Sequence, residues 1–208
     1  MVDFQSRETH RGSDDPESGS EDDTASSETA ASSATDAGSA AGAGVAPPAD
    51  AGGAVSVAIL VTGTDATEAA DAVADAIATE HEVLGRDERT GDLDAIQTAV
   101  DTFLDQPTVE AVVTVGGVGV GPDEVAVEAV EPLLDTQLPG FGELFRRRHE
   151  DEVGTKAIRN RAIAGLADTT PVFCLPGETA SARAATTDLL VPELYGLISA
   201  AGTPQSAD

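Results

Sequence analysis

The apolar residues beyond position 52 follow two alternating periods. The runs with the length and composition of strands cover residues 54–63, 81–88, 109–117 and 170–177. The first run is apolar on both faces, which is typical of a strand buried in a parallel sheet. The segments with helical spacing of apolar residues cover 64–80, 91–106, 123–135 and 179–202. Strand and helix therefore alternate, and this predicts an α/β domain with a mostly parallel, doubly wound sheet.

Individual residues refine these expected elements. Thr64 is the expected N-cap of the first helix, and Pro192 is expected to bend the last one. Segment 157–165 is expected to be helix that leads into a turn. The residues of the second helix expected to face the core are Leu93, Ile96, Val100, Phe103 and Leu104.

The first 52 residues have a different composition. They are rich in Ser, Asp, Glu, Ala, Gly and Thr and contain almost no large apolar residue. Such a segment cannot offset the entropy lost on ordering, so we expect an acidic, disordered leader over 1–52 and a disordered tail over 203–208. The leader is either a docking tail or a solubilising segment. The folded domain is expected over 53–202.

The net charge of the chain limits the partners that the protein can bind. The 208-residue chain has a formal net charge of -27, and Lys156 is its only lysine. An acidic, lysine-poor surface favours a folded protein adapted to high salt. It argues against nucleic acid and anionic membranes as partners, because both are bound by clustered Lys and Arg. The sequence shows neither a long apolar span nor a signal peptide, so we expect a cytoplasmic protein.

The single cysteine and the histidine at 149 give no strong chemical signal. Cys174 excludes an internal disulfide, and its apolar neighbours favour a small buried hydrophobe over a nucleophile. His149 has no spaced partner, so it predicts no metal site.

A glycine-rich turn follows the expected strand at 109–117. Gly116, Gly117 and Gly119 would stand at the carboxyl end of that strand, where glycine allows positive φ and close approach of a ligand. The amides that open the next helix could bind an anion such as phosphate. The alternative is a turn that serves packing alone. The spacing matches neither a Walker A motif nor a complete G-x-G-x-x-G fingerprint.

Two carboxylates follow this turn. Asp123 and Glu124 stand at the expected start of a helix, where acidic residues interact favourably with the helix dipole. Alternatively, one of them is a ligand of Mg²⁺ beside a phosphate, since hard cations prefer carboxylate oxygens.

Two further stretches could carry chemistry. The cluster Arg146–Arg148 either binds a polyphosphate or pairs with the acidic surface. The turn at Pro176 and Gly177, with Thr179 close behind, is either a phosphate cradle or an ordinary turn and cap. Because parallel strands share an edge, the turns at Gly116 and Pro176 are expected to lie together.

Taken in order, these stretches resemble the MoaB/Mog family of molybdenum-cofactor biosynthesis proteins. The glycine turn at 114–119 is similar to the family's Thr-Thr-Gly-Gly-Thr-Gly turn, and Glu124 stands where the family has an aspartate. The segments 139–146, 154–165 and 175–183 are similar to further family blocks. The resemblance runs from about Val55 to Ile198.

The resemblance implies a fold, a reaction and an assembly. The fold would be a three-layer α/β/α domain with a mostly parallel sheet, the molybdopterin-binding-like fold. The reaction would be Mg²⁺- and ATP-dependent adenylylation of molybdopterin, and the protein would form a homotrimer or homohexamer. Glu124 or Asp123 would be the catalytic metal ligand. The implied molybdopterin- or nucleotide-binding residues are Thr114, Gly116, Gly117, Gly119, Glu143, Asn160, Arg161, Pro176, Gly177 and Thr179.

Departures from the family pattern support an alternative. Val118 lacks a hydroxyl, Glu124 is longer than aspartate, and Glu178 places a negative charge in the expected nucleotide loop. The segment after the first strand is shorter than in the family and retains Asp65 and Thr67. These changes are consistent with a catalytically degenerate paralogue that binds molybdopterin or a nucleotide, or acts as a scaffold. A third hypothesis is a regulatory domain that senses pterin or nucleotide.

Overall fold

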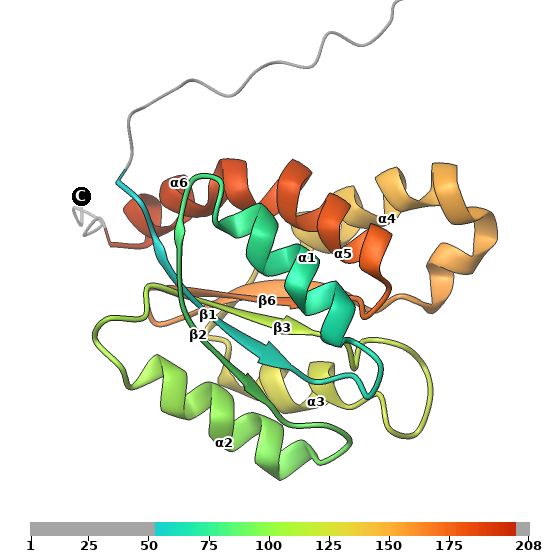
Figure 1. Cartoon of the computed structure of the whole chain (residues 1–208), viewed down its shortest axis with the longest axis horizontal. Coiled ribbons are helices and arrows are strands. Elements are labelled where there is room, and N and C mark those ends of the chain that lie inside the picture. The colour runs from blue at the N-terminus through green and yellow to red at the C-terminus, as the bar shows by residue number, and fades with distance from the viewer. Residues whose placement is uncertain (1–52, 203–208) are drawn as a thin grey trace, which may run out of the picture. The chain divides into compact units, whose positions relative to one another are not determined.

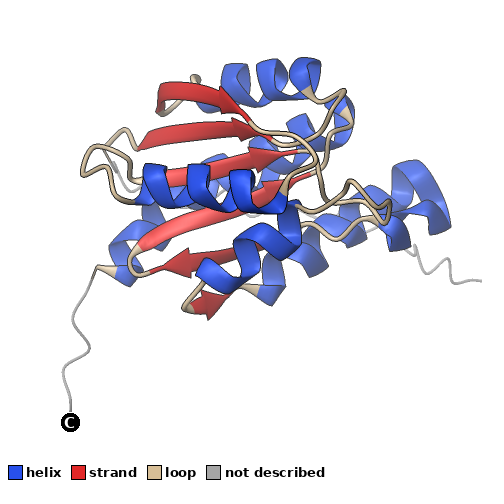
Figure 2. Cartoon of the chain, turned by 90° about the horizontal axis from the view of Figure 1, so that it is seen from below, coloured by secondary structure: helices blue, strands red, loops and turns tan. Residues whose placement is uncertain are grey.

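A six-stranded mixed sheet forms the centre of the domain. The structure is a computed structural model that describes residues 53–202, so the expectations for 1–52 and 203–208 lie outside the described residues. The strands, in sheet order, are β2 (Glu82–Glu88), β1 (Ser56–Val61), β3 (Ala111–Val115), β6 (Thr170–Leu175), β5 (Ile163–Ala167) and β4 (Thr136–Gln137). The first four run parallel, whereas β5 and β4 are antiparallel to their neighbours (Figure 2). The predicted mostly parallel sheet is confirmed.

Helices cover both faces of this sheet. Those on one face are α1 (Thr67–Ile77), α4 (Pro139–Val153), α5 (Thr179–Ala185) and α6 (Val191–Ala201), and those on the other are α2 (Leu93–Leu104) and α3 (Ala126–Val130) (Figure 1). Shorter helical turns are η1 (Glu131–Leu133), η2 (Gly154–Arg159) and the π-type turn η3 (Thr186–Leu190). The domain has the expected three layers.

Two apolar cores lie on the two sides of the sheet. Successive strand residues point to opposite faces, so Ile59 of β1 packs with α1, α5 and α6, whereas Leu60 packs with α2 and α3. Both are fully buried, which explains why the central strands are apolar throughout. Cys174 of β6 is buried in the second core, as expected from its neighbours, and burial raises the pKa of its thiol to about 12.

The sequence did not predict two strands, β5 and β4. β5 forms a hairpin with β6, and β4 is the edge strand of the sheet. Segment 157–165 is not helix leading to a turn: it contains the end of η2 and the start of β5. β5 pairs antiparallel with β6 through a tight connection in which Asp168 has a φ of 53°. A Cβ on Gly165 would lie 2.6 Å from the Thr136 carbonyl oxygen, so glycine allows β4 to pass close to β5.

The first helix starts later than expected. Its N-cap is Ala66, which offers no side-chain cap, and Thr64 is exposed instead. In α2, Ile96 and Val100 are fully buried as predicted, and Phe103 and Leu104 are partly buried. Leu93, the first residue of that helix, is 36% exposed and does not face the core.

The helix expected over 123–135 is much shorter. It begins at Ala126 and ends at Val130, and η1 follows. Pro132 has no N–H to continue the helical ladder, which accounts for the early end.

The last expected helix is divided just before Pro192. α5 leads into η3, and α6 begins at Val191 with Pro192 in its first turn. Pro192 cannot donate to the carbonyl of Asp188. Arg148 of α4 satisfies this carbonyl instead, with its Nη1 at 3.0 Å. No helix within residues 53–202 is long and apolar enough to cross a membrane.

Candidate functional site

Three turns meet at the carboxyl ends of β1, β3 and β6. They bring together Gly63, Gly116 and Gly177, and a Cβ on Gly116 would lie 2.4 Å from the Gly63 nitrogen. A Cβ on Gly177 would lie 3.3 Å from Gly116 Cα. Gly116 also has a φ of 95°, which L side chains rarely adopt. The glycines therefore let three turns form one continuous floor, and the turns at Gly116 and Pro176 lie together as predicted.

Hydrogen bonds fasten this floor. The Gly63 amide donates to the Val115 carbonyl at 3.2 Å, and the Gly116 amide donates to the Leu175 carbonyl at 2.9 Å. The buried hydroxyl of Thr62 donates to the Gly116 carbonyl at 2.8 Å. Each turn is thus bonded to its neighbour, and the backbone of the floor is held before any ligand arrives.

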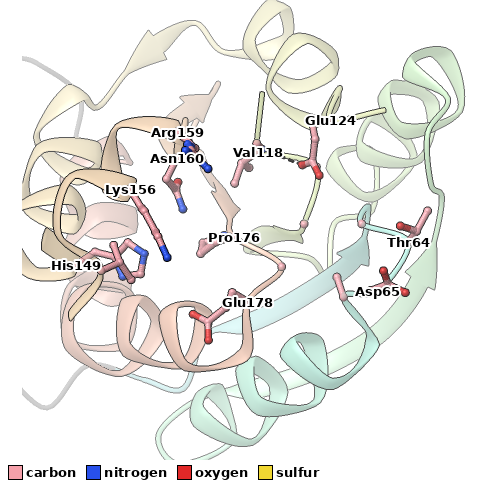
Figure 3. Close-up of a pocket in the computed structure, with 17 residues that line it drawn as sticks. Thr64, Asp65, Val118, Glu124, His149, Lys156, Arg159, Asn160, Pro176 and Glu178 are labelled. Atoms are coloured by element: carbon pink, nitrogen blue, oxygen red, sulfur yellow. Dashed lines mark hydrogen bonds between the residues drawn. The ribbon is translucent and has the colours of Figure 1, made fainter. Parts of the chain in front are cut away.

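A pocket of about 390 Å³ lies over the floor (Figure 3). One part of its wall comes from the strand-end turns and the other from α4 and η2. The acidic side chains in this lining are Asp65, Glu124 and Glu178, and the basic or titratable nitrogen groups are His149, Lys156 and Arg159. In Figure 3, Lys156 and His149 lie across the cavity from Asp65 and Glu124. Asp65 and Glu124 therefore make one side of the pocket acidic, whereas Glu178 stands on the same side as His149 and Lys156.

Glu124 closes the glycine-rich loop and faces the pocket. Its Oε2 accepts a hydrogen bond from the Gly119 amide at 2.8 Å, which leaves Oε1 for another partner. Gly117 has a φ of 68°, and its carbonyl accepts from the Ala126 amide at 3.0 Å. A Cβ on Gly117 would lie 2.7 Å from Ala126 Cβ. The loop is consequently folded tightly against the start of α3.

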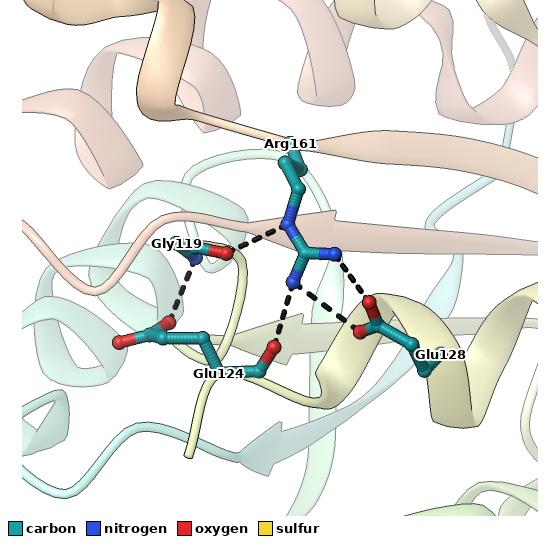
Figure 4. A network of polar contacts seen from close by, with 4 residues as sticks. All are labelled: Gly119, Glu124, Glu128 and Arg161. Carbon is teal, nitrogen blue, oxygen red and sulfur yellow. Dashed lines mark hydrogen bonds and ion pairs between the residues drawn. The ribbon is translucent and has the colours of Figure 1, made fainter. Parts of the chain in front are cut away.

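Arg161 holds this loop from behind (Figure 4). Its Nε donates to the Gly119 carbonyl at 2.6 Å, and its Nη2 donates to the Glu124 carbonyl at 2.6 Å. The guanidinium also pairs with the carboxylate of Glu128 on α3, through Nη1 and Nη2. The hydrogen bond from Arg161 lowers the pKa of Glu128. One arginine thus connects both ends of the loop to the helix that follows it.

Glu178 occupies the amides that open α5. Its carboxylate accepts from the Ala180 amide at 3.2 Å and from the Ser181 amide at 2.8 Å, and it also accepts from the Ser181 hydroxyl. The hydroxyl bond is the main cause of a lowered pKa of Glu178, and the amides and the charge of His149 act in the same direction. The carboxylate therefore stands at the helix start where the sequence suggested a phosphate cradle.

His149 lies between the pocket and a second cavity of about 280 Å³ that α4, α5 and η3 line. Its Nδ1 is 3.2 Å from the hydroxyl of Ser181, and its ring stacks on Phe145 with centroids 5.2 Å apart. Ser181 is buried. The imidazole is therefore held on two sides and is a fixed part of the pocket wall.

The sequence singled out some residues that line the pocket and some that do not. Those in the lining are Gly116, Gly117, Gly119, Glu124, Asn160, Pro176 and Gly177. Those outside it are Thr114, Asp123, Glu143, Arg161 and Thr179. Thr114 is fully buried in β3, and Asp123 is exposed. Glu143 lines a separate cavity of about 180 Å³ beside β4 and β5.

Sequence reasoning assigned no ligand role to Lys156, Arg159 or His149. One signal could have found Lys156, because a single lysine in a chain of net charge -27 stands out. Of the arginine cluster, Arg148 bonds to Asp188 and Arg147 is exposed, and neither lines this pocket. The basic side of the pocket comes instead from the segment that follows the cluster.

Magnesium is the metal that the resemblance implies, and the residues fit a sparsely coordinated ion. Within residues 53–202 no three His, Cys, Asp or Glu side chains gather as a metal cage. Mg²⁺ needs no such cage when it is shared with substrate phosphates, because one or two carboxylates then suffice. Glu124 offers a carboxylate oxygen in the pocket, and Asp65 lines the same side.

Fold and pocket define an α/β protein with a cavity at the carboxyl edge of its parallel strands, the place where such sheets bind ligands. The sequence profile described as "Probable molybdopterin binding domain" matches residues 58–196. The chain belongs to this family.

Relatives and solved structures agree with this assignment. Molybdenum cofactor biosynthesis protein B of Staphylococcus epidermidis is 41% identical over 109 residues, which make up 51% of this chain and 62% of that protein. The matched part is therefore less than two thirds of that relative. A crystal structure of molybdenum cofactor biosynthesis protein B superposes with a TM-score of 0.67 at 31% sequence identity. The match covers 71% of this chain and 96% of that protein's chain. A molybdopterin biosynthesis protein from Mycobacterium abscessus has a TM-score of 0.63 at 32% identity, with 71% and 95% covered.

Proposed function

We propose that the protein acts in molybdenum cofactor biosynthesis, where it binds molybdopterin in the pocket and transfers AMP from Mg²⁺-ATP to its terminal phosphate. Family membership and the names of its relatives support the pathway. The observation that carries the proposal is the pocket itself, in which Glu124 lies across a glycine floor from Lys156. Such a site presents both signs of charge to a phosphate-bearing ligand and its metal ion.

In this proposal the chain contributes position and charge. A phosphate oxygen of the pterin attacks the α-phosphorus of ATP, the bond to the β-phosphate oxygen breaks, and pyrophosphate leaves. The fixed floor holds the reacting groups close together, which lowers the entropic part of the barrier. Lys156 and Arg159 offset the negative charge of the phosphates. Glu124 would hold Mg²⁺ through Oε1, and the ion would supply further charge neutralisation when bound.

A second candidate function is binding without transfer. It is favoured by Glu178, whose carboxylate accepts from two amides and the hydroxyl at the start of α5. A nucleotide phosphate at these amides would have to displace a carboxylate of the same charge sign. The protein would then bind or carry the pterin without adenylylating it.

One experiment separates the two functions. Purified protein is incubated with molybdopterin and Mg²⁺-ATP in molar KCl, and the adenylylated pterin is measured by mass spectrometry. We expect product from the wild type and a loss of about 10²-fold or more in Glu124→Ala, the scale of a lost preorganised charged group. Asp123→Ala, which removes an exposed carboxylate beside it, is the matched control and should retain turnover.

The opposite outcomes are equally informative. Turnover that survives in Glu124→Ala but not in Asp123→Ala would reverse the choice of metal ligand. Absence of product, with pterin binding intact and ATP binding restored only in Glu178→Ser, would establish the binding function in place of the transferase.

A further inference from the structure

Four basic side chains of the described domain have partners within the fold, whereas Lys156 and Arg159 face the pocket. In the first group, Arg86 pairs with Asp71, Arg89 with Asp87, Arg161 with Glu128, and Arg148 with the carbonyl of Asp188. Among the side chains that the structure describes, no hydrogen bond or ion pair engages Lys156 or Arg159. Both line the pocket. Their charges are therefore available to a ligand.

Lys156 and Arg159 lie on the same face of the helical turn η2. It is a 3₁₀-helix, which has three residues per turn, so residues three apart lie above one another. Lys156 and Arg159 have this spacing. Ala157 between them is buried, and the turn ends in a bond from the Asn160 amide to the Ala157 carbonyl at 3.1 Å. The backbone of η2 is thus anchored while the two charged ends reach the pocket (Figure 3).

The end of η2 is also tied to the glycine loop. The Asn160 side chain accepts from the Ala162 amide at 2.9 Å, and the Arg161 amide donates to the Val118 carbonyl at 2.9 Å. The position of η2 relative to the floor is therefore fixed by bonds on the side of Arg159. A ligand that lies on the floor meets Lys156 and Arg159 at one wall and Asp65 and Glu124 at the other. The third carboxylate, Glu178, lies on the side of His149, where the Ala180 and Ser181 amides and the Ser181 hydroxyl already bind it.

We propose that Lys156 and Arg159 form a phosphate-binding wall that selects ligands ending in a phosphate ester and orients them toward η2. This inference rests on the proposed function, because it assigns one end of the proposed substrate to one wall of the same pocket. A phosphate monoester carries close to two negative charges at neutral pH, and Arg and Lys both suit it. Asp65 and Glu124 on the opposite side repel the same group, and the charge of Glu178 is already bound by two amides and a hydroxyl, so the arrangement specifies a direction.

The phosphate could belong to the pterin or to the nucleotide, and the ligands tested must tell these apart. Neopterin monophosphate and neopterin differ only in the phosphate, and ATP tests the nucleotide. Calorimetry would be run at about 0.15 M and about 1 M KCl. At the higher salt the screening length is about 3 Å, so only direct contacts keep their effect.

The variants are Lys156→Gln, Arg159→Gln and the double variant. Lys156→Arg keeps the charge and should restore binding if charge is what matters. Arg147→Gln is the control, because it removes an exposed charge of the neighbouring helix that does not line the pocket. Thermal melts confirm that every variant is folded.

We expect the wild type to prefer neopterin monophosphate over neopterin. Each glutamine variant should weaken the phosphate ester by about tenfold to a hundredfold, the scale of one charge-assisted hydrogen bond, and leave neopterin unchanged. If the glutamine variants lose affinity for ATP alone, the phosphate-binding wall is supported and its ligand is the nucleotide. Equal affinities of the double variant and the wild type for every phosphate ligand would overturn the proposal.

Failure of the proposed function can be distinguished from failure of the phosphate-binding wall. If the wild type bound neither pterin, pyrophosphate would still test the wall by thermal shift. Stabilisation of the wild type but not of the double variant would keep the wall and reject the pterin. An identical shift in both proteins would reject the wall.

Discussion

Arg161 and Glu128 form a two-point ion pair, with Nη1 on Oε1 and Nη2 3.2 Å from Oε2, and this pair joins the chain before β5 to helix α3. The same guanidinium bonds to the carbonyls of Gly119 and Glu124. The ion pair is therefore part of the support of the glycine-rich loop.

Arg161→Lys should destabilise the domain more than Glu128→Gln. Lysine cannot reproduce the planar fork, so at least one carbonyl contact is lost, at a cost of about 1–3 kcal/mol in the free energy of unfolding. The Glu128 side chain is about half exposed, and its replacement by Gln should cost less than about 1 kcal/mol. Urea titration at fixed salt measures both. Equal effects of the two variants would mean that the carbonyl contacts add nothing to the ion pair.

Gly116→Ala should be among the most destabilising small substitutions in the domain. The new Cβ would lie 2.4 Å from the Gly63 nitrogen. The alanine backbone would also have to keep a φ of 95°, which L residues rarely adopt. Strain and overpacking together predict a loss of about 3 kcal/mol or more. Gly196→Ala is the control: it lies within α6 with open space around its Cβ, and it should stabilise by about 0.5–1 kcal/mol. A Gly116→Ala protein that melts with the wild type would contradict the close contact of the turns.

Glu178 should make stability depend on pH at the acid end. Its pKa is lowered below the usual 4.5 in the folded protein, mainly by the Ser181 hydroxyl. A carboxyl with a depressed folded-state pKa adds stability above its unfolded pKa, and this contribution is lost as the pH falls through the folded value. Glu178→Gln should therefore flatten the stability profile below about pH 4.5.

Glu80→Gln, at an exposed position after α1, controls for the loss of one negative charge. Melts over a pH series compare the three proteins. Parallel profiles of Glu178→Gln and the wild type would show that the cap does not contribute.

The assembly remains a prediction from the family resemblance. Ile158 is 84% exposed and Val120 is 69% exposed, and such apolar side chains are suited to an interface. Light scattering of the full chain in molar KCl should give the mass of three or six copies. A monomer mass at every salt concentration would refute this.

The central strands and the floor of the site could be predicted because their signals are local. A buried parallel strand is apolar on both faces, and a turn that must approach another turn shows as glycine, as at Gly116 and Gly177. Parallel topology then placed the two turns together without further information.

The hairpin of β5 and the start of α1 could not be predicted, because distant contacts decide them. β5 is short, and its strand conformation depends on pairing with β6 and on the passage of β4 beside Gly165. Thr64 has the chemistry of an N-cap, but residue Ala66 contacts the glycine turns and fixes where the helix begins. Lys156 was overlooked for a related reason, because charge in a local window does not show which side chains face a pocket.

The contact of three glycines at the floor bears on how such a domain can change over generations. The turns after β1, β3 and β6 touch through Gly63, Gly116 and Gly177, so an insertion in any one of them must be accommodated by the other two. Changes in length are therefore confined to the parts of these turns that lie beyond the three glycines, as in the shortened segment after β1. Lys156 and Arg159 are exposed on η2, and either can be exchanged without moving the floor. New ligand preferences would therefore arise most readily on η2, while the contact of the three glycines is kept.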